Sequence, residues 1–176
     1  MGTTNTDSPS VDLVVLTRDS NALHPAIQQA IDAQDGVTLK VHRVVGNLRP
    51  DDHTRWEVIA RARNQGKSLG SSPWIMFLDD DVILHPQCIA TLVEKLRTSP
   101  AYAAVAADYL GESRPKKVAR HVSMGATLFR RQILQQLRFR WEDQRCECQC
   151  CCDDLRRMHW GIDYCYEASA EHLRKP

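Results

Sequence analysis

The chain has 176 residues, of which 43% are hydrophobic and 26% charged, and this suits one globular domain with a full core. Its 23 basic and 22 acidic side chains give a net charge of +1, so the composition excludes an electrostatic argument for a nucleic-acid partner or an anionic membrane. No apolar run approaches the roughly 20 residues of a membrane span and no signal peptide is recognisable, so we expect no transmembrane segment and a cytoplasmic location.

The predicted elements alternate between strand and helix along most of the chain. Residues 1–10 are polar and expected to be disordered, and the folded domain is expected to span residues 11–176. Apolar β-branched runs and alternating patterns predict strands, in chain order, at 11–17, 37–45, 74–78, 101–109, 121–129 and 162–168. Apolar residues at helical spacing predict helices at 24–34, 53–69, 85–100, 130–138 and 153–160. This alternation favours a parallel sheet with helices on both faces, in which ligands bind at the carboxyl ends of strands.

Three consecutive aspartates, Asp79 to Asp81, directly follow the strand predicted at 74–78. In an extended segment, Asp79 and Asp81 would face one side and Asp80 the other. Two carboxylates aimed at one point form a hard-oxygen site for Mg²⁺ or Mn²⁺, whose other positions stay open to phosphate oxygens and water. The alternative interpretation is a solvated acidic cluster that caps the following segment.

The stretch RARNQGKSLGSSPWIMFLDDDVILHP, residues 61–86, resembles the family 2 glycosyltransferases of the A-type fold. Members of that family carry a strand that ends in a D-x-D or DDD motif, after a helix with an ARN.G pattern. The residues that match the helix pattern are Arg61, Ala62, Arg63, Asn64, Gly66 and Gly70. The later segment SMGATLFRRQIL is similar to a glycine-containing strand of the family. The resemblance implies a single Rossmann-like A-type glycosyltransferase domain with a mostly parallel central sheet flanked by helices.

The same resemblance implies a metal-dependent inverting glycosyltransferase that moves a sugar from a UDP- or GDP-sugar donor to an acceptor hydroxyl. It implies that Mn²⁺ or Mg²⁺ binds Asp81 first, with Asp79 beside it, and stabilises the charge of the leaving nucleoside diphosphate. His172 matches a family histidine that is often a third metal ligand. The donor-binding residues that it implies are Thr17, Arg18, Asp19, Asn47, Arg61, Asn64, Asp79 and Asp80. For the helix arginines, the alternative is a salt bridge on the helix face.

The base-binding segment departs from the family pattern. Gly46 and Asn47 follow the second predicted strand, where the family commonly has an acidic residue. Asn47 can still hydrogen-bond a base, so the choice of nucleotide stays open. The chain is also short for the family and leaves little sequence for an acceptor site, which is compatible with a small acceptor, a partner subunit or lost activity.

The catalytic base is the second departure, because an inverting transfer needs a carboxylate to take the proton from the acceptor hydroxyl. The segment CCCDDLRRMHWG resembles a shortened form of the family's acidic segment, with Asp153 as first choice of base and Asp154 as second. A gapless match instead puts the family's acidic pair on Gln149 and Cys150. The alternative role for both aspartates is helix capping.

Five of the seven cysteines lie in one run: Cys146, Cys148, Cys150, Cys151 and Cys152. In an extended loop Cys146, Cys148 and Cys150 would point the same way and could serve as ligands of zinc or an iron–sulfur cluster. The alternative is a set of small buried hydrophobic residues with some redox-prone thiols. The run therefore supports a second functional hypothesis, a non-catalytic nucleotide-sugar or metal-binding module with a Cys-rich site.

Overall fold

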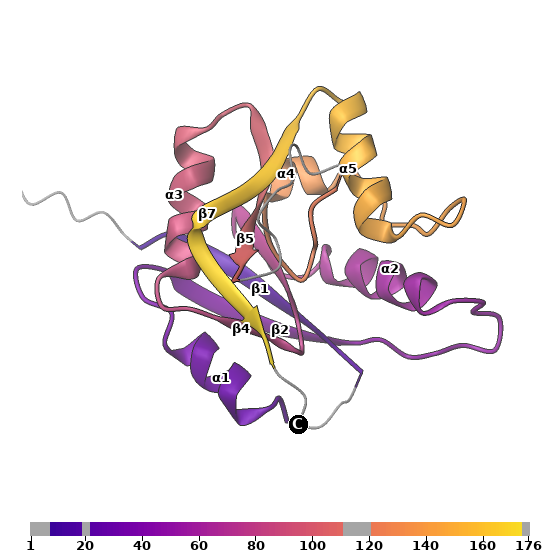
Figure 1. The fold of residues 1–176 in the computed structure, drawn as a ribbon, viewed down its shortest axis with the longest axis horizontal. Coiled ribbons are helices and arrows are strands. Elements are labelled where there is room, and N and C mark those ends of the chain that lie inside the picture. Colours follow the sequence, from indigo (N-terminus) through magenta and orange to yellow (C-terminus); the bar gives the residue numbers. More distant parts are fainter. Residues whose placement is uncertain (1–7, 19–21, 111–120, 174–176) are drawn as a thin grey trace, which may run out of the picture.

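The computed structural model describes residues 8–18, 22–110 and 121–173. Seven strands form one sheet in the order β2-β1-β3-β6-β5-β7-β4, with helices on both sides (Figure 1). The strands are β1 (Ser10–Thr17), β2 (Thr38–Val45), β3 (Trp74–Asp79), β4 (Val82–Leu84), β5 (Tyr102–Tyr109), β6 (Ala126–Arg130) and β7 (Gly161–His172). The helices are α1 (Pro25–Asp32), α2 (Arg55–Gly66), α3 (Cys88–Thr98), α4 (Arg131–Leu134) and α5 (Glu147–Arg157). The expectations for residues 1–7 and for Asp19 fall outside the described residues.

The α/β fold class is confirmed, and the sheet is mixed, not purely parallel. β1 pairs in parallel with β2 and β3, and β5 with β7. β6 lies between β3 and β5 and runs antiparallel to both, and β4 runs antiparallel to β7. A parallel neighbour needs a crossover connection, usually a helix, and no helix is described between β5 and β6. The sequence pattern shows strands but not their directions.

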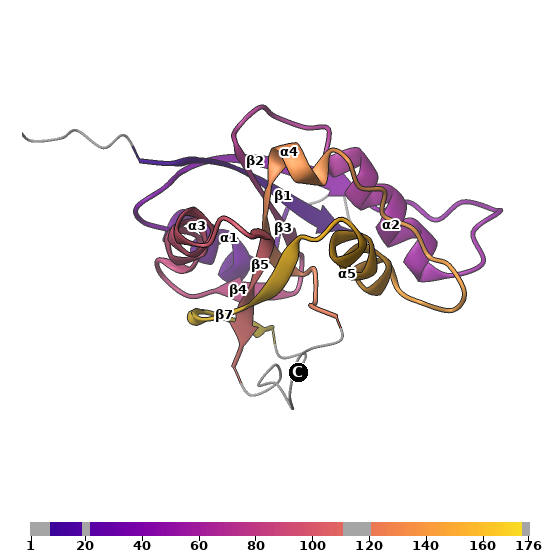
Figure 2. The same ribbon diagram turned by 90° about the horizontal axis from the view of Figure 1, so that it is seen from above.

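The alternation of side chains along the central strands divides the core between the two faces of the sheet. In β3, Met76 and Leu78 pack with α1 and α3, whereas Ile75 and Phe77 pack with α2, α4 and α5. Figure 2 shows the same division, with α1 and α3 on one side of the sheet and α2, α4 and α5 on the other. Both faces are covered, so β1 and β3 are buried along most of their length.

A buried ion cluster fixes the amino end of β1. Asp12 is fully buried and accepts hydrogen bonds from Ser72 N at 2.7 Å and Arg131 Nη2 at 2.6 Å. His42 Nε2, on β2, lies 2.8 Å from the other carboxylate oxygen. A buried charge is tolerated only where it is paired and hydrogen-bonded. The partners of Asp12 come from β2, α4 and the segment before β3, so the cluster joins these parts of the chain to β1.

Two differences from the sequence prediction lie near the acidic triplet or the cysteines. The strand β4 follows β3 after only two residues, where no strand was predicted. The helix α5 begins at Glu147, so the cysteine run is helical and not an extended loop. Its buried side includes Cys148, Cys151, Cys152 and Leu155, which together supply an apolar face.

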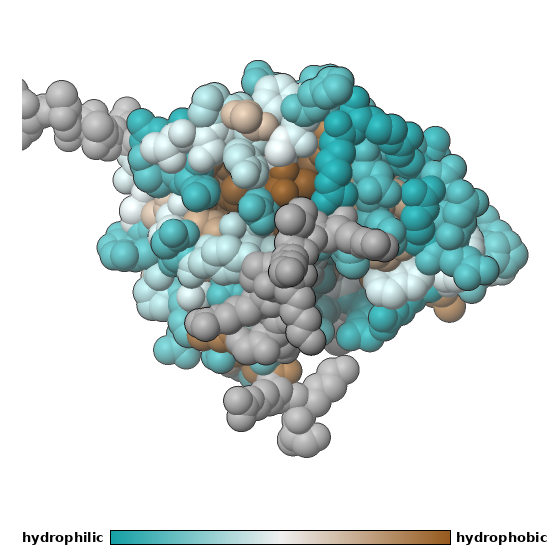
Figure 3. All heavy atoms as spheres, turned by 45° about the horizontal axis from the view of Figure 1, so that its top comes forward, coloured by the Kyte–Doolittle hydropathy of each residue, from teal (hydrophilic) through white to brown (hydrophobic). Residues whose placement is uncertain are grey.

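The outer surface agrees with a balanced, polar composition. The face turned forward in Figure 3 is mostly hydrophilic, with a small apolar patch near its upper centre. The large exposed hydrophobic side chains among the described residues are Val41, Leu48, Leu110 and Tyr166. None of the described helices has the length and apolarity that crossing a membrane would require.

Candidate functional site

A cavity of about 630 Å³ opens at the carboxyl ends of β1 and β3. It is where an α/β sheet of this kind is expected to bind ligands. The cavity brings together six residues predicted to bind the donor or the metal: Thr17, Arg18, Asp79, Asp80, Asp81 and His172. It is also lined by Arg63, Cys146 and Cys148, which belong to the sequence motifs, and by residues that no motif indicated, among them Trp56, His121 and Glu147.

The acidic triplet is held by the ends of neighbouring strands. Asp79 is the last residue of β3, and Asp80 and Asp81 form the turn to β4. The expected alternation of an extended segment is therefore wrong, and all three aspartates line the same cavity. Asp80 N donates to Leu16 O at 3.1 Å, and Arg18 N donates to Asp80 Oδ2 at 3.1 Å, which ties the turn to the end of β1.

The three carboxylates have different surroundings. Asp79 Oδ1 lies 3.1 Å from Arg63 Nη2, and Asp80 accepts the backbone hydrogen bond from Arg18. The Asp81 carboxylate makes no hydrogen bond or ion pair with the part of the chain that the structure describes, whereas its carbonyl accepts from Leu173 N at 2.7 Å. Asp81 is therefore the carboxylate most available to an added cation.

The guanidinium of Arg63 connects the triplet to the start of α5. It is buried and donates from Nε to Glu147 Oε1 at 3.3 Å and from Nη1 to Met124 O at 3.2 Å. Burial alone would lower the pKa of Arg63, but Asp79 and Glu147 outweigh this and raise that pKa. The second oxygen of Glu147, Oε2, is buried without a hydrogen-bond partner. A buried carboxylate oxygen without a hydrogen-bond partner is rare in folded proteins.

His172 lies at the end of β7, beside the turn. Its neighbour in the β4–β7 ladder is Val82, the residue after Asp81. The imidazole stacks on the ring of Tyr109 with 4.8 Å between ring centroids and 25° between planes. Burial is the main cause that raises the pKa of Tyr109, so this phenol stays protonated at neutral pH.

Three predicted donor-binding residues do not line the cavity. Asn64 clasps the backbone of Phe139, donating from Nδ2 to its carbonyl at 2.7 Å and accepting from its N–H at 3.0 Å. Arg61 pairs with both oxygens of Asp52 at 2.7 Å and donates to Asn47 O at 2.9 Å. The side chain of Asn47 is exposed, although its neighbours Gly46 and Leu48 reach the cavity. In this structure Arg61 forms the salt bridge of the alternative interpretation, and Asn64 is hydrogen-bonded to the Phe139 backbone.

Neither predicted base lines the cavity. Asp153 pairs with Arg145 at 3.2 Å and Arg156 at 3.3 Å. Asp154 is paired with Arg140 and, at 2.7 Å, with Arg157. Both aspartates lie in the later turns of α5, about 9 to 10.5 Å along the helix from Glu147 at 1.5 Å per residue. The acidic side chain of α5 that reaches the cavity is Glu147, and its position at the first turn of a helix is the signal that could have identified it.

The helix α5 turns the cysteines of the run in different directions, some into the core and some toward the cavity. Burial raises the pKa of Cys152 to about 11, and its sulfur accepts a hydrogen bond from Val122 N at 3.3 Å. Cys151 is buried in the same apolar cluster. The expected group of Cys146, Cys148 and Cys150 is not formed. Within the described residues, His121 joins Cys146 and Cys148 instead, with their possible ligand atoms all within 4.8 Å of one another.

The fold is that of an A-type glycosyltransferase domain. The family model described as glycosyl transferase family 2 matches residues 46–160, more than half of the chain. The chain belongs to glycosyl transferase family 2, and it is a glycosyltransferase by that membership. No curated protein sequence matches the chain significantly.

Solved structures support the same fold. Glucosyl-3-phosphoglycerate synthase from Mycobacterium tuberculosis, in complex with Mn²⁺, UDP and phosphoglyceric acid, aligns at a TM-score of 0.64 and 19% identity, over 96% of this chain and 72% of that chain. The mannosyltransferase PcManGT from Pyrobaculum calidifontis, in complex with GDP-Man and Mn²⁺, aligns at 0.67 and 15% identity, over 96% of this chain and 58% of that chain. A197 from STIV aligns at 0.60 and 10% identity, over 95% and 86% of the two chains.

Proposed function

We propose that this chain is a metal-dependent inverting glycosyltransferase that moves a sugar from a UDP- or GDP-sugar to an acceptor hydroxyl. The observation that carries the proposal is the cavity at the carboxyl ends of β1 and β3, into which the turn Asp80–Asp81 and the start of α5 both open. Family membership and the complexes of the structural neighbours with Mn²⁺ and UDP or GDP-Man support it.

The residues present fit Mn²⁺ or Mg²⁺. Asp81 supplies a carboxylate without a protein partner among the described residues, and Asp79 supplies one that also pairs with Arg63. Neither these carboxylates nor His172 appear in a described group of three possible ligand atoms within 4.8 Å. Mg²⁺ commonly takes one or two carboxylates and completes its shell with phosphate oxygens and water, so this donor set is sufficient. A bound divalent ion would neutralise charge on the leaving diphosphate.

The donor is proposed to lie along the ends of β1 and β2. Thr17 and Arg18 line the cavity at the end of β1, and Asp80 is positioned by the backbone of Arg18. The indole of Trp56 and the side chain of Leu48 provide apolar surface on the same cavity. Bases and riboses bind where an apolar wall is combined with a few positioned polar groups, and this part of the cavity has both.

Glu147 is proposed to act as the base. In a single displacement, the acceptor oxygen attacks the anomeric carbon, the bond from that carbon to the diphosphate breaks, and a carboxylate takes the hydroxyl proton. Oε2 of Glu147 is buried without a hydrogen-bond partner and is the atom proposed to take that proton, while Oε1 is held by Arg63. Asp153 and Asp154 are each paired with two arginines and do not line the cavity, so the geometry favours Glu147 over both.

A thermal-shift panel of UDP, GDP and other nucleoside diphosphates, each with and without Mn²⁺, tests the donor site. We expect one nucleotide to raise the melting temperature only when Mn²⁺ is present, and Asp81→Ala to abolish the rise. Asp153→Asn is the matched control and should keep it. If none of the nucleotides changes the melting temperature, with or without Mn²⁺, the proposed donor site is contradicted. Stoichiometric zinc or iron without any nucleotide effect would favour the non-catalytic metal-binding module.

A further inference from the structure

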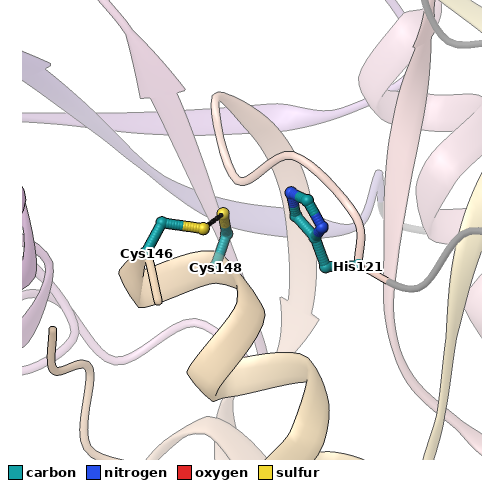
Figure 4. Close-up of side chains that lie close together, drawn as sticks. All are labelled: His121, Cys146 and Cys148. Carbon is teal, nitrogen blue, oxygen red and sulfur yellow. Dashed lines mark hydrogen bonds between the residues drawn. The ribbon is translucent and has the colours of Figure 1, made fainter. Parts of the chain in front are cut away.

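A second cluster of metal-ligating side chains lies on the same cavity, apart from the aspartates. His121 comes from the segment before β6, and Cys146 and Cys148 come from the start of α5. Figure 4 shows the two sulfurs facing each other, with the His121 ring on the neighbouring segment. Their possible ligand atoms all lie within 4.8 Å of one another, and the two sulfurs are 2.7 Å apart. Among the described residues this is the one group of three or more such side chains that close together.

We propose that His121, Cys146 and Cys148 bind a thiophilic divalent cation of the Zn²⁺ type, with its fourth coordination position open to the cavity. Two thiolates and one imidazole are ligands that zinc prefers, whereas Mn²⁺ and Mg²⁺ prefer oxygen. An iron–sulfur cluster usually takes four thiolates, and this group offers two sulfurs. The site does not depend on the proposed sugar transfer.

The distances fit a tetrahedral ion after small side-chain movements. With zinc about 2.3 Å from sulfur and about 2.0 Å from nitrogen, these tetrahedral ligand atoms would lie roughly 3.5 to 3.8 Å from one another. The sulfurs, now 2.7 Å apart, would separate by about 1 Å, and the remaining ligand separations already lie within 4.8 Å. Three protein ligands with a free fourth position are the arrangement of zinc sites that also bind water or a substrate group.

The geometry of α5 explains why Cys146 and Cys148, and not the other three cysteines of the run, lie together at this site. Cys146 is the extended N-cap of α5, and its sulfur accepts from Gln149 N at 3.4 Å. Cys148 lies in the first turn of α5. Because Cys146 is extended rather than helical, its side chain can reach the Cys148 sulfur. Cys150 is about 200° around the helix from Cys148 and therefore points away. Its sulfur contacts Arg145 O at 3.9 Å, and Cys151 and Cys152 pack into the core cluster.

The two metal sites would share one cavity but select different ions. The Asp79–Asp81 turn offers oxygen only, and the His121–Cys146–Cys148 group offers sulfur and nitrogen. Glu147 lies between the two cysteines in the chain and is paired with Arg63. A cation held by Cys146 and Cys148 would therefore fix the backbone that carries Glu147, and would link the start of α5 to the segment before β6.

Titration of metal-free, fully reduced protein with Co²⁺ tests the proposal without any activity assay. We expect one Co²⁺ per chain, with the visible bands of tetrahedral cobalt and sulfur-to-cobalt charge-transfer absorption, and displacement by Zn²⁺. Cys146→Ser, Cys148→Ser and His121→Gln should each weaken binding at least about tenfold. His121→Gln changes an exposed residue, so it tests the site even if a cysteine variant does not fold.

Three controls separate this site from other sources of binding. Asp81→Asn should keep the full cobalt spectrum and lose the Mn²⁺-dependent nucleotide shift, while Cys165→Ser and His53→Gln should bind cobalt like the unmodified protein. Circular dichroism checks that each variant is folded. The proposal is overturned if cobalt binds without sulfur charge-transfer absorption, or if the three ligand variants bind cobalt as tightly as the unmodified protein. It is also overturned if a Cys146–Cys148 disulfide persists in reductant and excludes metal.

Discussion

Arg63, buried in α2, holds Asp79 at the end of β3 through a contact of 3.1 Å between Nη2 and Oδ1. The same guanidinium reaches Glu147 at the start of α5. One side chain thus sets the relative positions of the acidic turn and the carboxylate proposed as base. It does so from a helix whose sequence alone is also compatible with a surface salt bridge.

Replacing Arg63 should destabilise the fold strongly. Arg63→Met leaves the nearly fully buried carboxylate of Glu147 unpaired, and removing one partner of a buried pair costs about 3 kcal/mol or more. The ion pair between Arg63 and Asp79 contributes less to stability, because the Asp79 side chain is 39% exposed and solvent screens its charge. Urea unfolding measures the loss. Arg97→Ala, which removes an exposed pair with Glu94, is the control and should change stability by less than about 0.5 kcal/mol.

The proposed base can be separated from its rivals by kinetics. Glu147→Gln should lower kcat for Mn²⁺-dependent release of nucleoside diphosphate from the donor by about 100-fold or more, with nucleotide affinity changed by less than about twofold. Asp153→Asn and Asp154→Asn should keep most of the turnover, because they alter ion pairs away from the cavity. The assignment of Glu147 fails if turnover survives Glu147→Gln and is lost in either aspartate variant.

The role of Asn64 is predicted to be structural. Asn64→Ala removes two hydrogen bonds to the Phe139 backbone and should lower the free energy of unfolding by about 2 kcal/mol. Nucleotide affinity, measured by calorimetry with Mn²⁺, should stay the same. Asn47→Ala, at an exposed position beside the cavity, is the companion variant and should leave stability unchanged. A large loss of nucleotide affinity in Asn64→Ala would restore its donor-binding assignment.

The buried Asp12 cluster should make stability depend on acid pH. Burial tends to raise the pKa of Asp12, but hydrogen bonds from His42 and Ser72 and the charge of Arg131 outweigh it and hold that pKa below 3.8. A lowered folded-state pKa stabilises the fold above the unfolded value, and this stabilisation is lost as pH falls through the folded value.

Asp12→Asn should therefore lose about 3 kcal/mol of stability at pH 7 and show a shallower decline than the unmodified protein below about pH 4. Urea unfolding across that range measures both slopes. Ser10→Ala, in the same strand, is a control that keeps the carboxylate and should retain the steeper decline. Parallel pH curves for Asp12→Asn and the unmodified protein would contradict the assignment.

Much of the local structure could be predicted from the sequence. The apolar runs at β1, β3 and β5 and the helical spacing in α1 and α3 identify those elements, because burial requires that periodicity. The three-residue strand β4 and the start of α5 were missed, since neither a short edge strand nor a helix rich in cysteine has a distinct local pattern. The antiparallel directions of β4 and β6 were also missed, since strand direction depends on connections rather than on side-chain alternation.

The sequence by itself determined that an acidic triplet follows a buried strand and that the surrounding motif resembles one glycosyltransferase family, because both are properties of adjacent residues. Only the tertiary structure decided which side chains share the cavity. It directs Glu147 inward and Asp153 and Asp154 to arginines, and it brings His121 to Cys146 and Cys148. The reason is that helix phase and long-range packing choose among chemically similar residues, and neither is encoded in spacing along one segment.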